Sequence, residues 1–230
     1  MAETNGPLVW DQAGEKLYET GTDRGAIYPY KGSAYQAGVA WTGLRQVSES
    51  PDGAEETALY ADNIKYASML SAENFKFTIG AYTYPDEFAA LDGSAPLQEG
   101  MAGVTMGQQN RGMFGFTYRT LIGNDTKGNE FGYKLHIVYG AKVSPSSREN
   151  NTINDSPAAV EMSWDATTTP QAVPGGKSTA HIVIDSTKVT PAQLKAVEDM
   201  LYGNGSQAPK LPMPSDLISI FSGSTTPAAG

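Results

Sequence analysis

Hydrophobic and polar residues alternate with a period of two in several segments, which is the pattern of half-buried β-strands. The clearest case is residues 131–141, where one face carries Phe131, Tyr133, Leu135, Ile137, Tyr139 and Ala141. The other face carries Lys134, His136 and Lys142. Faces that alternate in this way are typical of antiparallel sheets with one face in water.

Four further segments, 75–84, 112–122, 158–166 and 179–185, repeat this alternation. Their hydrophobic faces carry Phe75, Phe77, Ile79, Phe114, Phe116, Tyr118, Ile122, Val160, Met162, Trp164, Ala180, Ile182 and Ile184. Their opposite faces carry Lys76, Thr78, Tyr82, Tyr84, Arg111, Thr117, Arg119, Glu161, Ser163, Asp165, Thr179, His181 and Asp185. Segments 37–48 and 56–66 are less regular strands. The turn residues at 123–129 predict a hairpin between 112–122 and 130–142.

One helix has a clear start and end. Thr190 and Gln193 form a Thr-x-x-Gln capping box, and Pro191 suits the first helical position. An apolar stripe at helical spacing follows, made of Leu194, Val197, Met200 and Leu201. Gly203 is expected to end the helix in the left-handed conformation. Shorter helical turns are predicted at 85–91 and 215–221.

These elements predict a mainly β fold of two packed antiparallel sheets, a sandwich or barrel, with one flanking α-helix. We expect an arm rich in glycine and aromatic residues, together with the first strands, at 1–58. The β-sandwich domain follows at 59–221 and a flexible tail at 222–230. The arm is expected to contact another subunit, through aromatic residues set among glycines: Trp10, Tyr18, Tyr28, Tyr30, Tyr35 and Trp41.

Composition excludes several classes of function. The chain has 16 Lys and Arg against 25 Asp and Glu, for a net charge of −9, and no Lys/Arg run, which disfavours ordinary nucleic-acid binding. The absence of cysteine excludes disulfides, thiolate zinc sites, iron–sulfur clusters and cysteine nucleophiles, and two histidines exclude a histidine-rich metal site. No apolar run approaches 18 residues and the N-terminus has no signal-peptide features, so we expect no membrane insertion and synthesis in the cytosol.

The search for a chemical site finds none. Gly-x-Ser-x-Gly, Walker A and Gly-x-Gly-x-x-Gly motifs are absent from the sequence. His136 is interpreted as a surface histidine, and His181 lies about 13 Å from Asp185 along one strand face, too far for a catalytic pair. Asp125-x-Lys127-x-Asn129 has a lysine where a calcium loop needs an oxygen ligand, so it is interpreted as a hairpin turn. We therefore predict no catalytic, cofactor-binding or metal-binding residue, no cofactor, and a structural or binding protein rather than an enzyme.

A set of longer strings resembles one family, the major tail proteins that form the tail tube of siphophages and prophages of Gram-positive bacteria. The resemblance covers residues 38 to 221. The strings are ALYADNIKY (58–66), SAENF (71–75), AYTYPDEF (81–88), GQQNR (107–111), YRTLIGNDT (118–126), GYKLH (132–136), TINDSP (152–157) and IDSTK (184–188).

The resemblance implies a structural virion protein without catalytic residues. Such subunits assemble into rings, usually hexameric, in which strands of neighbours join into one β-barrel, and the rings stack into a tube. Implied partners are other copies of the chain, the tape measure protein inside the tube, the tail terminator and the distal tail or tail-tip proteins. DNA passes through the lumen without specific binding, and an acidic wall would repel it. The protein would be assembled in the bacterial cytoplasm and end in the virion tail.

Two other interpretations stay open. One is a ring-forming tail protein that does not polymerise, such as a terminator or distal tail protein. The other is a monomeric β-sandwich binding module with an exposed aromatic platform. Under the tube interpretation the arm before residue 60 is the first candidate for bridging rings and the loop 144–157 the second. Deletion of residues 1–30 is then expected to weaken stacking more than folding.

Overall fold

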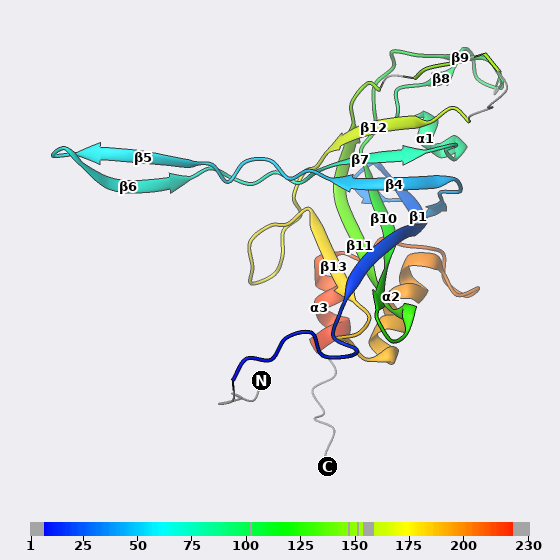
Figure 1. The fold of residues 1–230 in the computed structure, drawn as a ribbon. Coiled ribbons are helices and arrows are strands. Elements are labelled where there is room, and N and C mark those ends of the chain that lie inside the picture. The colour runs from blue at the N-terminus through cyan, green and yellow to red at the C-terminus, as the bar shows by residue number, and fades with distance from the viewer. Residues whose placement is uncertain (1–6, 102, 147, 151, 154–158, 223–230) are drawn as a thin grey trace.

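The structure is a computed structural model that describes residues 7–101, 103–146, 148–150, 152–153 and 159–222 (Figure 1). Its elements in chain order are β1 (Tyr18–Lys31), β2 (Ala34–Tyr35), β3 (Val39–Ala40), β4 (Leu44–Glu49), β5 (Glu56–Ala61), β6 (Ile64–Leu70), β7 (Lys76–Ala81), α1 (Asp86–Ala89), β8 (Ala95–Pro96), β9 (Thr105–Met106), β10 (Phe114–Asn124), β11 (Gly128–Val143), β12 (Met162–Thr167), β13 (His181–Asp185), α2 (Pro191–Tyr202) and α3 (Pro214–Ser222). The fold is mainly β with antiparallel pairing, as predicted.

The large sheet follows one path of antiparallel strands, in the order β2-β1-β10-β11-β12-β7-β4, with β13 paired to β11 and β3 to β1. Strand β11 belongs to both halves of this sheet: it pairs with β10 and β13 along most of its length and with β12 at its end. Between Val138 and Ala141 it carries one residue more than β10 does between Phe116 and Phe114, which is a β-bulge. Gly140 lies in this bulge with φ +60°, and beyond it β11 leaves β13 and pairs with β12 (Figure 1).

The first core lies between the two halves of the sheet. Trp164 of β12, Phe77 of β7 and Phe116 of β10 are buried there, together with Trp41 and Phe88. The Trp41 ring lies 5.7 Å from Trp164 and 4.6 Å from Phe88, in tilted and edge-on contacts that aromatic pairs prefer. The hydrophobic faces predicted for 75–84, 112–122 and 158–166 therefore face one another.

Helices α2 and α3 cover the other face of the half formed by β1, β10, β11 and β13, and this makes a second core. Leu135, Ile137 and Tyr139 of β11 are buried against Val197 and Leu201 of α2. The capping box at Thr190 is present as predicted. The prediction for Gly203 was wrong in its detail: its φ of 78° is positive, but its ψ of 162° is not that of the left-handed helix.

The expectation of one wet face was wrong for β10 and β11, because both of their faces are covered. Thr117, predicted on the polar face, is buried on the side of the helices, and His136 is buried under the end of β4. Ala141 belongs to the first core, unlike Leu135, Ile137 and Tyr139 of the same predicted face, because the bulge shifts the alternation. Val160 lies before β12 and is exposed, so its predicted place on the hydrophobic face was also wrong.

The N-terminal segment is not an arm throughout. Strand β1 is hydrogen-bonded to β10 over most of its length, Tyr28 is fully buried in the second core and Trp41 in the first. The arm interpretation was wrong for these residues. Of the described residues before β1, Leu8, Val9 and Trp10 are exposed. Deletion of residues 1–30 would thus remove a core strand.

Strands β5 and β6 form a two-stranded ribbon that projects far from the body of the molecule (Figure 1). The sequence pattern predicted a single strand over 56–66. The chain instead reverses at Asp62 and Asn63, whose φ values of 51° and 62° are those of a two-residue hairpin turn. The expected tail is outside the described residues from 223 on, as are parts of the loop 144–157. Among the described helices, none has the length and apolar character needed to cross a bilayer.

Candidate assembly surfaces and a histidine–glutamate cluster

The ribbon exposes large hydrophobic side chains along its whole length. Their exposed fractions run from 42% to 74%, and they are Leu59, Tyr60, Ile64, Tyr66, Met69 and Leu70. Polar contacts hold the ribbon only locally: Lys65 and Ser68 bind Glu56, and Lys76 binds Asp52 near its base. A two-stranded hairpin is marginally stable in water by itself. This surface therefore gains stability when another surface covers it.

The second uncovered surface is the edge of β13. Among the described residues β13 pairs with β11 on one side and with no strand on the other. Beside it, α3 and the chain around Val173 border an open hollow of about 460 Å³ lined mainly by apolar side chains, among them Ile182, Leu217 and Phe221. Unpaired strand edges next to apolar surface invite pairing with another chain.

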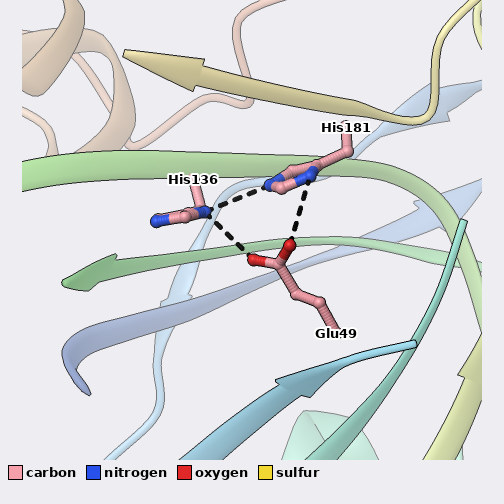
Figure 2. Close-up of side chains that lie close together, drawn as sticks. All are labelled: Glu49, His136 and His181. Atoms are coloured by element: carbon pink, nitrogen blue, oxygen red, sulfur yellow. Dashed lines mark hydrogen bonds and ion pairs between the residues drawn. The ribbon is translucent and has the colours of Figure 1, made fainter. Parts of the chain in front are cut away.

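A third feature is a cluster of Glu49, His136 and His181 (Figure 2). Glu49 is the last residue of β4, His136 lies in the middle of β11 and His181 opens β13. His136 Nδ1 lies 3.1 Å from His181 Nε2 and 3.4 Å from Glu49 Oε1, and His181 Nδ1 lies 4.0 Å from Glu49 Oε2. One nitrogen from each imidazole and one carboxylate oxygen all lie within 4.8 Å of one another.

Neighbouring side chains fix the three groups. His136 stacks on Tyr118 with ring centroids 4.3 Å apart, and His181 stacks on Phe75 at the same distance. The Tyr118 hydroxyl donates to Glu49 Oε1, and Thr120 Oγ1 lies 3.1 Å from His136 Nε2. The exposed fractions of the side chains are 7% for His136, 14% for His181 and 38% for Glu49. The cluster is therefore closed around the imidazoles and open on the side of the carboxylate.

The environment favours a charged carboxylate and a neutral imidazole. The hydrogen bond from His136 lowers the pKa of Glu49 to about 2, and the one from Tyr118 acts in the same direction while burial opposes both. Burial lowers the pKa of His181 to about 4, because it penalises the imidazolium. At neutral pH His181 thus has a free nitrogen lone pair beside an ionised Glu49.

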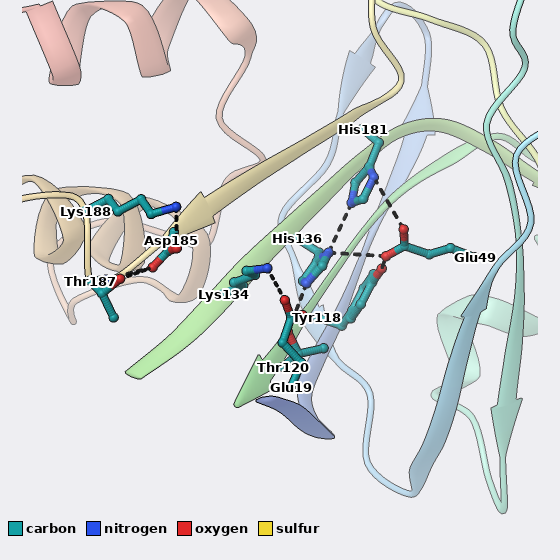
Figure 3. A network of polar contacts seen from close by, with 10 residues as sticks. All are labelled: Glu19, Glu49, Tyr118, Thr120, Lys134, His136, His181, Asp185, Thr187 and Lys188. Carbon is teal, nitrogen blue, oxygen red and sulfur yellow. Dashed lines mark hydrogen bonds and ion pairs between the residues drawn. The ribbon is translucent and has the colours of Figure 1, made fainter. Parts of the chain in front are cut away.

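From the cluster, polar side chains continue along the same face of β11 and β13 (Figure 3). Farther along that face Lys134 binds Glu19, and Asp185 pairs with Lys188 and accepts hydrogen bonds from Thr187. These groups are satisfied by close neighbours.

The structure shows where the residues that the sequence analysis examined as possible sites are placed. The interpretation of His136 as a surface histidine was wrong, since it is buried. His181 points to His136 and Glu49, whereas Asp185 binds Thr187 and Lys188, so those two are not brought together. Segment 125–129 forms the tip of the β10–β11 hairpin, where Asp125 accepts a hydrogen bond from the Gly14 amide.

The sequence analysis missed the cluster. Its two histidines are 45 positions apart, and Glu49 comes from a third strand, so no spacing motif joins them. One signal was available: the only two histidines of the chain fall on the polar faces of two predicted strands.

Comparison with known proteins gives little further information. No family model matches the chain, and no curated protein matches it. Among solved structures, the chain is similar to one from the PVC sheath–tube complex of an extracellular contractile injection system in its extended state, with 11% identity, a TM-score of 0.29, and coverage of 70% of this chain and 88% of that chain. It is also similar to a chain of the anti-feeding prophage baseplate, with 5% identity, a TM-score of 0.34, and coverage of 79% and 100%. Both TM-scores lie below 0.5, so neither structure bears on what this chain does.

Proposed function

We propose that the chain is a self-assembling structural protein, the tail tube subunit of a long-tailed phage. The observation that carries the proposal is that one chain leaves two different apolar surfaces uncovered, the β5–β6 ribbon and the β13 edge. Contacts between unlike surfaces are heterologous: they close into rings where the rotation permits and otherwise continue as open stacks. A tube of stacked rings needs one contact of each kind.

The β13 edge is suited to the contact within a ring. A strand of a neighbouring copy added to this edge would satisfy the free backbone groups of β13, and its side chains would enter the apolar hollow beside α3. Closing a sheet across subunits removes an edge that is a liability in a free monomer.

The ribbon is suited to the contact between rings. It projects beyond the body in Figure 1, so it can reach a copy that the β13 edge does not touch. Its exposed Tyr60, Ile64 and Tyr66 would be buried there. Burial of apolar surface contributes a favourable free energy of about 25 cal/mol per Å². A few such side chains therefore stabilise each contact between rings, and the same contact is repeated along the tube.

The more specific parts of the proposal rest on the sequence strings that resemble siphophage major tail proteins. They are a hexameric ring, a lumen that holds the tape measure protein and later passes DNA, and ends that bind a terminator and tail-tip proteins. The net charge of −9 is compatible with a wall that does not retain DNA. No catalytic step is proposed.

The test combines negative-stain electron microscopy and light scattering over a range of protein concentrations, with and without tail-tip complex. The unmodified chain is expected to give hollow tubes of uniform diameter. A ribbon variant with Tyr60→Ser, Ile64→Ser and Tyr66→Ser should give single rings, and Val183→Lys on β13 should give monomers. The control is Tyr82→Ser, an exposed tyrosine of the body, which should still give tubes.

Other outcomes point elsewhere. Closed single rings from the unmodified chain, which never stack, would favour a terminator or distal tail protein. Monomers at every concentration, even with tail-tip complex, would refute the tube and favour a binding module. Tubes from both the ribbon and β13 variants would show that these surfaces are not the contacts.

A further inference from the structure

We propose that Glu49, His136 and His181 form a binding site for a divalent transition metal ion such as Zn²⁺. The site is independent of the proposed function, because it lies within one copy of the chain. It brings together both histidines of the protein, which come from two different strands, and the last residue of a third.

The separation of the donor atoms fits a tetrahedral ion. Zinc binds imidazole nitrogen at about 2.0–2.1 Å and carboxylate oxygen at about 2.0–2.2 Å, which places neighbouring ligand atoms roughly 3.3–3.5 Å apart. The contacts of His136 Nδ1 with His181 Nε2 and Glu49 Oε1, at 3.1 and 3.4 Å, are close to that spacing (Figure 2). The widest separation within the donor set is 4.8 Å at most, and Glu49, the most exposed member, can close it by rotating its side chain.

The groups around the donors have the arrangement of a metal centre's outer shell. A histidine that binds a metal usually donates its other ring N–H to an oxygen, and ligating carboxylates are hydrogen-bonded in turn. Thr120 Oγ1 lies 3.1 Å from His136 Nε2, so it can accept that proton while Nδ1 binds the ion. The Tyr118 hydroxyl donates to Glu49, which holds the carboxylate toward the histidines (Figure 3).

The donor set also selects the class of ion. Ca²⁺ takes six to eight oxygen ligands, and Mg²⁺ keeps an octahedral shell of oxygen and water, so two imidazoles and one carboxylate suit neither. Imidazole suits zinc, copper and nickel. The aromatic rings of Tyr118 and Phe75 stack on the two histidines and limit water on that side. The open side at Glu49 leaves a fourth position for water.

A bound ion would act as a cross-link. Glu49 ends β4, and the chain continues from there toward the projecting ribbon, whereas His136 and His181 belong to β11 and β13. The ion would therefore tie the base of the ribbon to the other half of the sheet. Binding to the folded chain alone raises its stability by mass action.

The experiment uses the full chain, free of any polyhistidine tag and treated with a chelator. Zn²⁺ is titrated by isothermal calorimetry, and thermal unfolding is followed with and without Zn²⁺. One Zn²⁺ ion per chain is expected to bind, and a free Zn²⁺ concentration of 100 times Kd is expected to raise the Tm of the chain by roughly 5–10 °C. Co²⁺ should give the visible absorption bands of a tetrahedral site, and Zn²⁺ should remove them.

Variants decide whether the ion binds at this cluster. Glu49→Gln and His181→Gln should each weaken Zn²⁺ binding at least 10-fold and reduce the Tm shift at the same Zn²⁺ concentration to about half or less. Thr120→Val, which changes only the outer shell, should weaken binding roughly 10–100-fold. The control is Glu99→Gln, an exposed carboxylate between β8 and β9. The Tm of Glu49→Gln and of His181→Gln in the absence of metal shows whether each variant is folded. Absence of stoichiometric binding to the unmodified chain, or binding that survives both variants, would show that the cluster is only a network of hydrogen bonds.

Discussion

Tyr133 shows how one side chain ties helix α2 to the sheet, and it gives a prediction about alkaline pH. Its hydroxyl donates to Glu198 Oε1 at 2.8 Å. Burial raises the pKa of Tyr133 to about 12, and the bond to Glu198 acts in the same direction. A folded pKa above the unfolded value of about 10 means that the contribution is complete below pH 10 and is lost as the pH rises toward 12.

Tyr133→Phe removes this bond, so the variant should be less stable than the unmodified chain by about 1 kcal/mol at pH 8. The gap in the free energy of unfolding, measured in urea, should narrow as the pH rises from about 10 toward 12. Tyr82→Phe, at an exposed position, serves as the control and should show no gap. A gap that stays constant with pH would mean that the hydroxyl of Tyr133 contributes through packing alone.

At the scale of residues, the sequence predicts a side chain's face better than its surroundings. Trp164, Phe77 and Phe116 lie on the predicted hydrophobic faces and are buried. His136 lies on the predicted polar face, yet it is buried because Glu49 and His181 reach it from other strands. Alternation along one strand contains no information about which distant strand covers its polar face, and the cluster could not be predicted for that reason.

At the scale of elements, Gly140 controls the bend of β11 and offers a matched pair of variants. It has φ +60°, and a Cβ added there would lie 2.4 Å from the Thr169 carbonyl oxygen. Gly175 has a similar φ of +73° but nothing within 4 Å. Gly175→Ala should therefore cost only the backbone strain, about 1–2 kcal/mol.

Gly140→Ala adds the steric conflict with a backbone atom to that strain, so a total of about 3–4 kcal/mol is expected. Urea unfolding of both variants measures the difference. Equal losses in the two proteins would show that the bulge can relax, and that β11 does not depend on glycine at this position.

The elements themselves were predictable where a local signal exists. Helix α2 has its capping box at Thr190, and the β10–β11 hairpin has its turn residues at 123–129. The β5–β6 hairpin was missed because its turn, Asp62–Asn63, carries no glycine, and the segment was interpreted as one strand. The bulge at Gly140 was missed because the alternation before it continues formally through Ala141.

At the scale of the whole molecule, the sequence predicts the fold class. It does not predict which segments belong to the body of the molecule and which project from it. Strand β1 was expected in a segment that reaches another subunit, but it pairs with β10 within the large sheet. The surface that does project, β5–β6, lies at 56–70. The difference arises because glycine and aromatic content indicates irregular local structure, whereas pairing along β1 is decided by β10, far away in the sequence.

This partition gives the last prediction, on two N-terminal deletions. Gly14 is joined to the β10–β11 hairpin: its amide donates to Asp125 Oδ1 at 2.9 Å and its carbonyl accepts from Asn124 at 3.0 Å. Removal of residues 1–13 leaves these bonds and strand β1 intact, so the thermal transition should stay within about 2 °C of the unmodified chain. Removal of residues 1–31 deletes β1 with the buried Ile27 and Tyr28, and loss of two such side chains costs roughly 5–10 kcal/mol, comparable with the whole 5–15 kcal/mol that holds a domain folded. Strand β10 also loses the hydrogen-bond partner along that edge. The chain without residues 1–31 should show no cooperative transition by circular dichroism.

Removal of residues 1–13 also removes the exposed Leu8, Val9 and Trp10. If the tube proposal is right, the apolar surface of these side chains is covered only on assembly. This deletion should therefore raise the protein concentration at which tubes appear, without changing the melting temperature of the subunit. Tubes at an unchanged concentration would assign the contacts between rings to the ribbon alone, and a lost transition in the shorter deletion would mean that residues before Gly14 belong to the folded body.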